Sequence, residues 1–171
     1  MTERKGIVTF KGGPLTLVGN EVKVGDTAPE ATLLANDLSP VRIGSLRGKV
    51  LILSCVPSLD TPVCDAQTRK FNQAAAALGN DVEILTISMD LPFAQKRWCG
   101  AAGIDRVRTL SDHRDAAFAT AYGLLLKELR LLARAVLVVD KAGKVQYVEL
   151  VKEVTQEPDY EAALAAAKKL V

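Results

Sequence analysis

Residues 49–64, with the sequence KVLILSCVPSLDTPVC, decide the fold. The stretch opens with a continuous apolar run rather than an alternating one, which is typical of a strand covered on both faces of its sheet. Further along, Thr61 is a good helix N-cap, and Pro62 fits the first helical position. The stretch therefore predicts a central strand over residues 49–56 that passes through a short loop into a helix.

The segments on either side alternate between strand and helix patterns. Steps of four and three separate Cys64, Thr68, Phe71, Ala75 and Leu78, which predicts an amphipathic helix that Gly79 ends. The other predicted elements are strands over 31–35, 41–43, 82–89 and 107–110, helices over 92–99, 112–121 and 158–171, a hairpin of 135–140 with 144–151, and an N-terminal hairpin of 7–10 with 15–18. Gly100 is expected to stop the helix over 92–99. This order predicts an α/β fold in which helices cover a sheet.

Length and composition restrict the class of protein. The chain has 171 residues, 49% of them apolar, and at about 150 residues per domain we expect a single domain over 1–171 with a hairpin extension over 1–20. A net charge of +2 does not favour nucleic acid as a partner. The uninterrupted apolar runs, such as 50–53 and 135–139, are far shorter than the roughly 20 residues of a membrane helix. The charged start does not resemble a secretion signal, so we expect a cytoplasmic protein that does not bind a membrane.

Three cysteines, Cys55, Cys64 and Cys99, form an odd set in a chain long enough to hold a core without disulfides. In a reducing compartment such cysteines are core residues, metal ligands or redox-active groups. Cys64 falls in the first turn of the predicted helix, where unpaired backbone N–H groups and the helix dipole favour a thiolate. A buried position on the apolar stripe explains Cys64 equally well. Spacing alone therefore leaves both interpretations of Cys64 open.

Pro57, Thr61 and Cys64 match the active-site pattern of the peroxiredoxins, which is Pro, three residues, Thr, two residues, Cys. Three segments also resemble the bacterial thiol peroxidase subfamily: the Ser-x-Asp-Thr-x-Val-Cys form of 58–64, DLPFAQ at 90–95 and EPDYEAAL at 157–164. The resemblance covers nearly the whole chain. It implies a thioredoxin fold of the peroxiredoxin type with the extra N-terminal hairpin.

The resemblance also implies roles for five residues. Cys64 would attack the peroxide O–O bond and become a sulfenic acid, and Thr61 would orient thiolate and peroxide through its hydroxyl. Pro57 would shield the pocket from water, and Arg134 would stabilise the thiolate and the leaving oxygen. Cys99 would be the resolving residue, which attacks the sulfenic acid and closes an intramolecular disulfide. Judged without the family, Arg134 is better explained as an exposed strand start, and Cys99 as a buried structural thiol.

The family further implies hydrogen peroxide and organic hydroperoxides as substrates, thioredoxin as the reductant and a homodimer, with no metal, haem or flavin. Bridged cysteines need Cα atoms within about 7 Å. If the reduced protein holds Cys64 and Cys99 farther apart, the helical turns that carry them must unwind locally. Two other functions stay open. One is a thiol–disulfide exchanger, although that activity usually uses C-x-x-C, and the other is a redox sensor in which oxidation of Cys64 changes a partner surface.

The remaining candidate residues have structural interpretations. Cys55 lies within the predicted central strand and is expected in the core. His113 is expected to be solvated at a helix start, whereas Ser58 and Asp60 are turn or cap residues unless they carry a chemical role. The three cysteines and the single histidine lack the close paired spacings of a zinc site.

The segment 122–132 departs from the family pattern. It is a few residues shorter and lacks the usual glycine before Leu-Ala-Arg-Ala at 132–135. The departure concerns the pocket wall and the dimer contact rather than the chemistry of Cys64. Leu124–Leu126 and Leu129–Leu132 are expected to form an exposed apolar surface that favours self-association.

Overall fold

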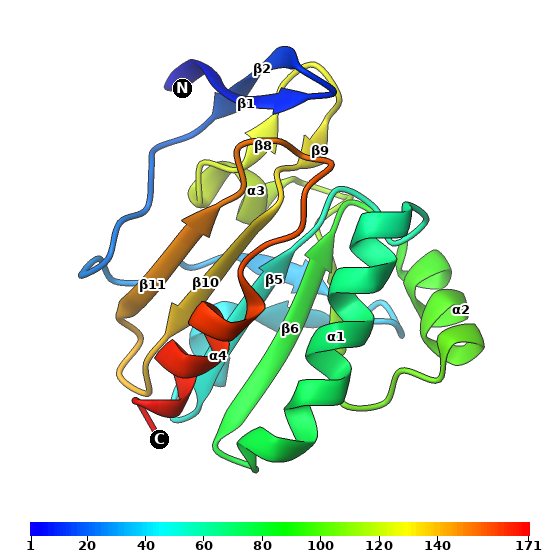
Figure 1. The fold of residues 1–171 in the computed structure, drawn as a ribbon, viewed down its shortest axis with the longest axis vertical. Helices are drawn as coiled ribbons and strands as arrows, with labels where there is room; N and C mark the ends of the chain where they lie inside the picture. Colours follow the sequence, from blue (N-terminus) through cyan, green and yellow to red (C-terminus); the bar gives the residue numbers. More distant parts are fainter.

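The computed structural model describes residues 1–171 and contains two β-sheets with helices packed around them (Figure 1). The strands are β1 (Glu3–Phe10), β2 (Gly13–Val18), β3 (Thr32–Leu34), β4 (Pro40–Arg42), β5 (Val50–Cys55), β6 (Val82–Ser88), β7 (Arg108–Ser111), β8 (Leu125–Leu126), β9 (Leu131–Leu132), β10 (Ala135–Val139) and β11 (Val145–Leu150). The helices are α1 (Pro62–Leu78), α2 (Pro92–Ala102), α3 (Ala117–Ala121) and α4 (Tyr160–Lys168), with a 3₁₀ turn, η1, at Ile43–Leu46.

The larger sheet has the strand order β11-β10-β5-β6-β7-β3-β4, and β5 is covered on both faces as predicted. Ile52 belongs to a core cluster with Phe71 of α1, whereas Leu53 belongs to a second cluster that includes Phe118 of α3. Successive strand residues point to opposite faces, so one apolar run supplies both clusters. Figure 1 shows α1 and α4 on the near face of the sheet and α3 behind it. The predicted α/β architecture is confirmed.

Parallel pairing brings the ends of β5 and β6 to one edge. Cys55, the last residue of β5, is opposite Ile87 near the end of β6. The loop that leads from β5 into α1 therefore lies beside the loop that leads from β6 into α2. Ligand sites of α/β proteins form at such carboxyl ends of strands.

The N-terminal hairpin of β1 and β2 belongs to a second sheet with the order β1-β2-β8-β9. Leu17 of β2 pairs with Leu126 of β8, and both side chains are fully buried. The expected exposed apolar surface over 124–132 is therefore wrong: Leu132 of β9 is also fully buried, and only Leu129 is clearly exposed. The leucines of β8 and β9 form part of the core beneath the hairpin.

Three helices have boundaries that differ from the predicted ones. α2 continues through Gly100 and ends at Ala102, and Gly103 follows with a φ of +67°, the left-handed conformation that closes helices. A glycine inside a helix costs only about 1 kcal/mol relative to alanine, so Gly100 does not stop α2. α3 begins five residues later than predicted, after Ala116, whose φ of +51° is left-handed and interrupts the helix, and the Asp112 carboxylate accepts two of the first N–H groups of α3. α4 is shorter than 158–171 at both ends. None of these helices has the length and apolar character needed to cross a membrane.

Candidate active site

Cys64 lies where the sequence places it, in the first turn of α1. Thr61 is the N-cap residue with an extended backbone, Pro62 opens the helix, and Cys64 is fully buried. The Thr61 hydroxyl donates to the carbonyl of Ser58 at 2.9 Å and makes no capping bond to the helix. The free N–H groups of this helical turn provide positive partial charge beside the sulfur.

Arg134 reaches Cys64 from the segment that joins β9 to β10. Its Nη2 donates to Cys64 Sγ at 3.2 Å, its Nη1 to Gln67 Oε1 at 2.9 Å, and its Nε to the carbonyl oxygen of Val154 at 2.8 Å. The Arg134 side chain is only 2% exposed, so its position is fixed by these three acceptors rather than by solvent. A guanidinium held against a sulfur stabilises the thiolate, which is the nucleophilic form.

Gln67 is a site residue that the sequence analysis missed. It lies one turn after Cys64 on α1, is fully buried, and accepts the hydrogen bond from Arg134 while its Nε2 donates to Ser54 Oγ at 2.7 Å. The two bonds fix the orientation of its amide and therefore that of the guanidinium. The available signal was a polar residue three positions after Cys64, on the apolar face of an amphipathic helix.

The loop before α1 is anchored by a single carboxylate. Asp90, which follows β6, accepts from Ser58 Oγ at 2.7 Å, from the Leu59 N–H at 2.8 Å and from Ser88 Oγ at 2.7 Å. Ser58 thus ties the loop to the end of β6, whereas Asp60 is exposed. Through these bonds, Asp90 fixes the loop before α1 relative to the end of β6, just before α2 begins.

Apolar residues cover the sulfur on its other sides. Val56 and Leu59 form a small cluster with Cys64, and Trp98 of α2 packs against this cluster. Pro57 is buried as well. The thiol is therefore enclosed in buried, mostly apolar surroundings, in which electrostatic interactions are strengthened.

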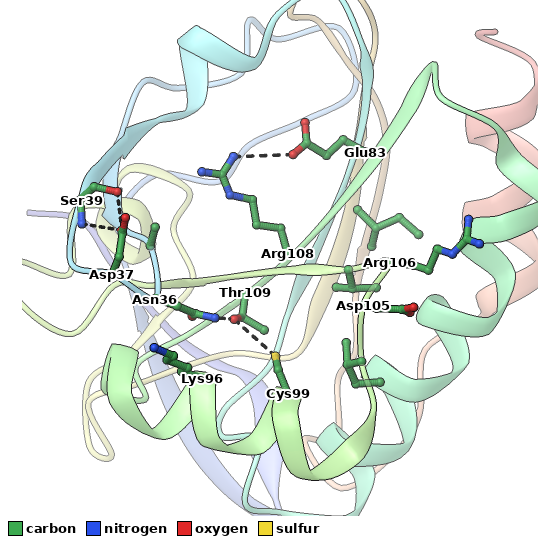
Figure 2. Close-up of a pocket in the computed structure, with 14 residues that line it drawn as sticks. Asn36, Asp37, Ser39, Glu83, Lys96, Cys99, Asp105, Arg106, Arg108 and Thr109 are labelled. Atoms are coloured by element: carbon green, nitrogen blue, oxygen red, sulfur yellow. Dashed lines mark hydrogen bonds and ion pairs between the residues drawn. The ribbon is translucent and has the colours of Figure 1, made fainter.

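Cys99 lies on α2 and is not bonded to Cys64; all three cysteines are free thiols. Figure 2 shows its sulfur directed towards Thr109 of β7, and the distance from Cys99 Sγ to Thr109 Oγ1 is 3.7 Å. The thiol lines a cavity of about 590 Å³ whose wall also carries Lys96 and Arg108. Burial raises the pKa of Cys99, and the Thr109 hydroxyl lowers it by a smaller amount. Arg134 thus contacts both Cys64 and Gln67, whereas Cys99 is directed towards Thr109.

Cys55 and His113 lie outside the site. Cys55 is fully buried in the larger core cluster, as expected, and burial raises the pKa of its thiol. His113 is partly exposed and lies in the turn before α3 rather than at a helix start. No group of three or more His, Cys, Asp or Glu side chains is placed to hold a metal ion.

Comparisons with known proteins point to one family. The family model described as Redoxin matches residues 23–164. The chain is 63% identical to the thiol peroxidase of Halalkalibacterium halodurans, over 94% of this chain and 96% of that protein. It is 62% identical to the thiol peroxidase of Bacillus subtilis, over 96% of this chain and 98% of that protein. A solved peroxiredoxin-like protein from Aquifex aeolicus has a TM-score of 0.90 and 46% identity, and the match covers 96% of both chains.

Proposed function

Because this chain belongs to the redoxin family, as a thiol peroxidase with a thioredoxin fold of the peroxiredoxin type, we propose that Cys64 is the residue that reduces the peroxide. The observation that carries this assignment is the 3.2 Å contact between Arg134 Nη2 and Cys64 Sγ. Neither Cys55 nor Cys99 has a guanidinium against its sulfur or a position in a first helical turn.

In the first step the Cys64 thiolate attacks one oxygen of the hydroperoxide. An S–O bond forms, the O–O bond breaks, and the other oxygen leaves as hydroxide or alkoxide, which takes up a proton to give water or an alcohol. Arg134 stabilises the thiolate and then the charge that develops on the leaving oxygen. The Thr61 hydroxyl, which can donate and accept, donates to the Ser58 carbonyl oxygen in the reduced protein, so its oxygen is placed to accept from the peroxide and orient it. Pro57 helps to exclude water.

In the second step the Cys99 thiolate attacks the Cys64 sulfenic acid. A disulfide forms, and hydroxide leaves and is protonated to water. Thioredoxin then reduces the disulfide by thiol–disulfide exchange. Because Cys99 faces Thr109 rather than Cys64 in the reduced protein, the first turn of α1 and part of α2 must move before the sulfurs meet. Recycling by thioredoxin places the protein in a reducing compartment, the cytoplasm.

Two cysteine variants test this assignment. Cys64→Ser is expected to abolish turnover with hydrogen peroxide and organic hydroperoxides. Cys99→Ser is expected to complete one turnover and then stall unless an external thiol is added. Intact mass and peptide mapping after one equivalent of peroxide should show a Cys64–Cys99 link in the parent. Normal turnover by Cys64→Ser would refute the assignment, and insulin reduction without peroxide would instead indicate a thiol–disulfide exchanger.

We also propose that the whole chain acts as one thioredoxin-like domain and pairs as a homodimer. A core cluster that contains residues of both sheets supports one domain. The exposed Leu91 and Phe93 at the start of α2, 52% and 65% exposed, support a contact with a second copy near the site. Light scattering of the parent should give the molar mass of two chains, whereas that of the Phe93→Asp variant should give the molar mass of a single chain. A parent that stays monomeric at high concentration would refute the dimer.

A further inference from the structure

Three side chains tie α1 to α2 beside the two reactive cysteines. Trp98 Nε1 donates to Asp65 Oδ1 at 2.9 Å, and Arg69 Nε donates to Asp65 Oδ2, also at 2.9 Å. The Arg69 guanidinium lies 5.7 Å from the centroid of the Trp98 ring, within the range of a cation–π contact. We call Asp65, Arg69 and Trp98 the helix clasp.

The helix clasp is adjacent in sequence to both thiols. Asp65 follows Cys64, and Trp98 precedes Cys99. Consecutive residues of an α-helix point about 100° apart, so α2 cannot direct Trp98 and Cys99 towards α1 together. With the indole bonded to Asp65 and packed against the Cys64 cluster, the Cys99 thiol faces β7 instead (Figure 2).

We propose that Trp98 is a positioning residue that holds Cys99 away from Cys64, so that opening the helix clasp limits the rate at which the disulfide closes. This inference rests on the two-cysteine reaction proposed above. In the closing step the Cys99 thiolate attacks the Cys64 sulfenic sulfur, the S–S bond forms, and hydroxide leaves. While the helix clasp is shut the sulfenic acid persists, and a second hydroperoxide can oxidise it to a sulfinic acid.

Trp98→Phe tests the proposal because phenylalanine keeps an aromatic ring but has no N–H donor. The reduced protein is mixed with one equivalent of hydrogen peroxide, and samples are quenched with acid at intervals. Free thiols are then alkylated, and the mass of the intact protein is measured by mass spectrometry. Disulfide closure is expected to become about fivefold faster than in the parent, which corresponds to about 1 kcal/mol at 1.4 kcal/mol per tenfold. Sulfinic acid formed under excess peroxide is expected to fall accordingly. Arg97→Ala, at an exposed position of α2, is the matched control and should close at the parental rate.

A second pair of variants separates the helix clasp from a general loosening of α2. Asp65→Asn keeps an oxygen that can accept from Trp98 and should stay near the parental rate, whereas Asp65→Ala should match Trp98→Phe. If the bond between them is the cause, the double variant Trp98→Phe/Asp65→Ala closes no faster than either single variant.

The outcomes distinguish this inference from the function on which it rests. Closure in Trp98→Phe that is as slow as in the parent, or additive effects in the double variant, would overturn the role of the helix clasp alone. A parent that forms no Cys64–Cys99 disulfide would overturn the two-cysteine reaction, and the role of Trp98 with it.

Discussion

Replacing Arg134 tests the site most directly, because one side chain serves three buried acceptors. In Arg134→Met the Cys64 sulfur loses its guanidinium donor at 3.2 Å. Removing a single preorganised donor of this kind costs about 10²- to 10³-fold in rate, or about 2.7–4 kcal/mol. We therefore expect Cys64 to be oxidised by hydrogen peroxide at least about a hundredfold more slowly. Arg134→Lys keeps the positive charge but not the planar guanidinium, so its rate of Cys64 oxidation is expected to lie between those of Arg134→Met and the parent.

The same change has a cost in stability. Gln67 Oε1 and the Val154 carbonyl oxygen lose their donor and stay buried, and each unsatisfied group costs about 1–3 kcal/mol. Removal of a buried charge offsets part of this sum. Circular dichroism must therefore show that the Arg134 variants are folded at the assay temperature. The assay is single-turnover oxidation of Cys64, quenched with an alkylating reagent and measured by mass. Folded Arg134→Met that oxidises Cys64 within threefold of the parental rate would refute the role of the guanidinium.

Three further perturbations follow from the geometry. Gln67→Leu removes the acceptor that orients Arg134 and should slow Cys64 oxidation about tenfold. A tenfold change corresponds to about 1.4 kcal/mol, slightly less than the net energy of one hydrogen bond to a charged group. An unchanged rate in the same single-turnover assay would contradict this. In a Cys64→Ser background, alkylation of Cys99 by iodoacetamide should have a pH midpoint above the ordinary thiol pKa of 9.0, because burial raises the pKa of Cys99; a lower midpoint would contradict it. Hydrogen bonds from the Thr155 backbone and hydroxyl lower the pKa of Glu153 from 4.5 to about 2. The stabilisation from Glu153 is therefore present above pH 4.5 and lost as the pH falls towards about 2. In urea unfolding, the free energy of unfolding of Glu153→Gln should fall less than that of the parent between pH 4.5 and about 2. An equal fall in both proteins would contradict the role of Glu153.

The position of Cys64 in the first turn of α1 was predictable because its determinants are local. Thr61, Pro62 and Cys64 lie within one helical turn, and capping rules act over that distance. Gln67 was not predictable to the same degree. Its partner Arg134 is 67 residues away and reaches it only because β10 pairs with β5 in the large sheet.

Other features escaped prediction because their cause lies in tertiary structure. β8 and β9 each contain two residues, too few to show an alternating pattern, and their leucines are buried by a hairpin from the other end of the chain. Asp90 belongs to the DLPFAQ segment at 90–95, but its role as loop anchor depends on the parallel alignment of β5 with β6, which that segment does not reveal. Gly100 gave a false stop signal because a glycine inside a helix costs only about 1 kcal/mol relative to alanine.

The second sheet has a consequence for synthesis on the ribosome. The backbone N–H of Thr16 in β2 bonds to Glu128, 112 residues later, and Thr9 bonds to the Lys152 carbonyl, 143 residues later. At a synthesis rate of about 5–20 residues per second, roughly 5–25 s pass between synthesis of β2 and synthesis of its partner strand β8. During that interval β2 has an open edge that can pair with another nascent chain. Until β8 has been synthesised, this edge of β2 is therefore the part of the second sheet most open to pairing between neighbouring nascent chains.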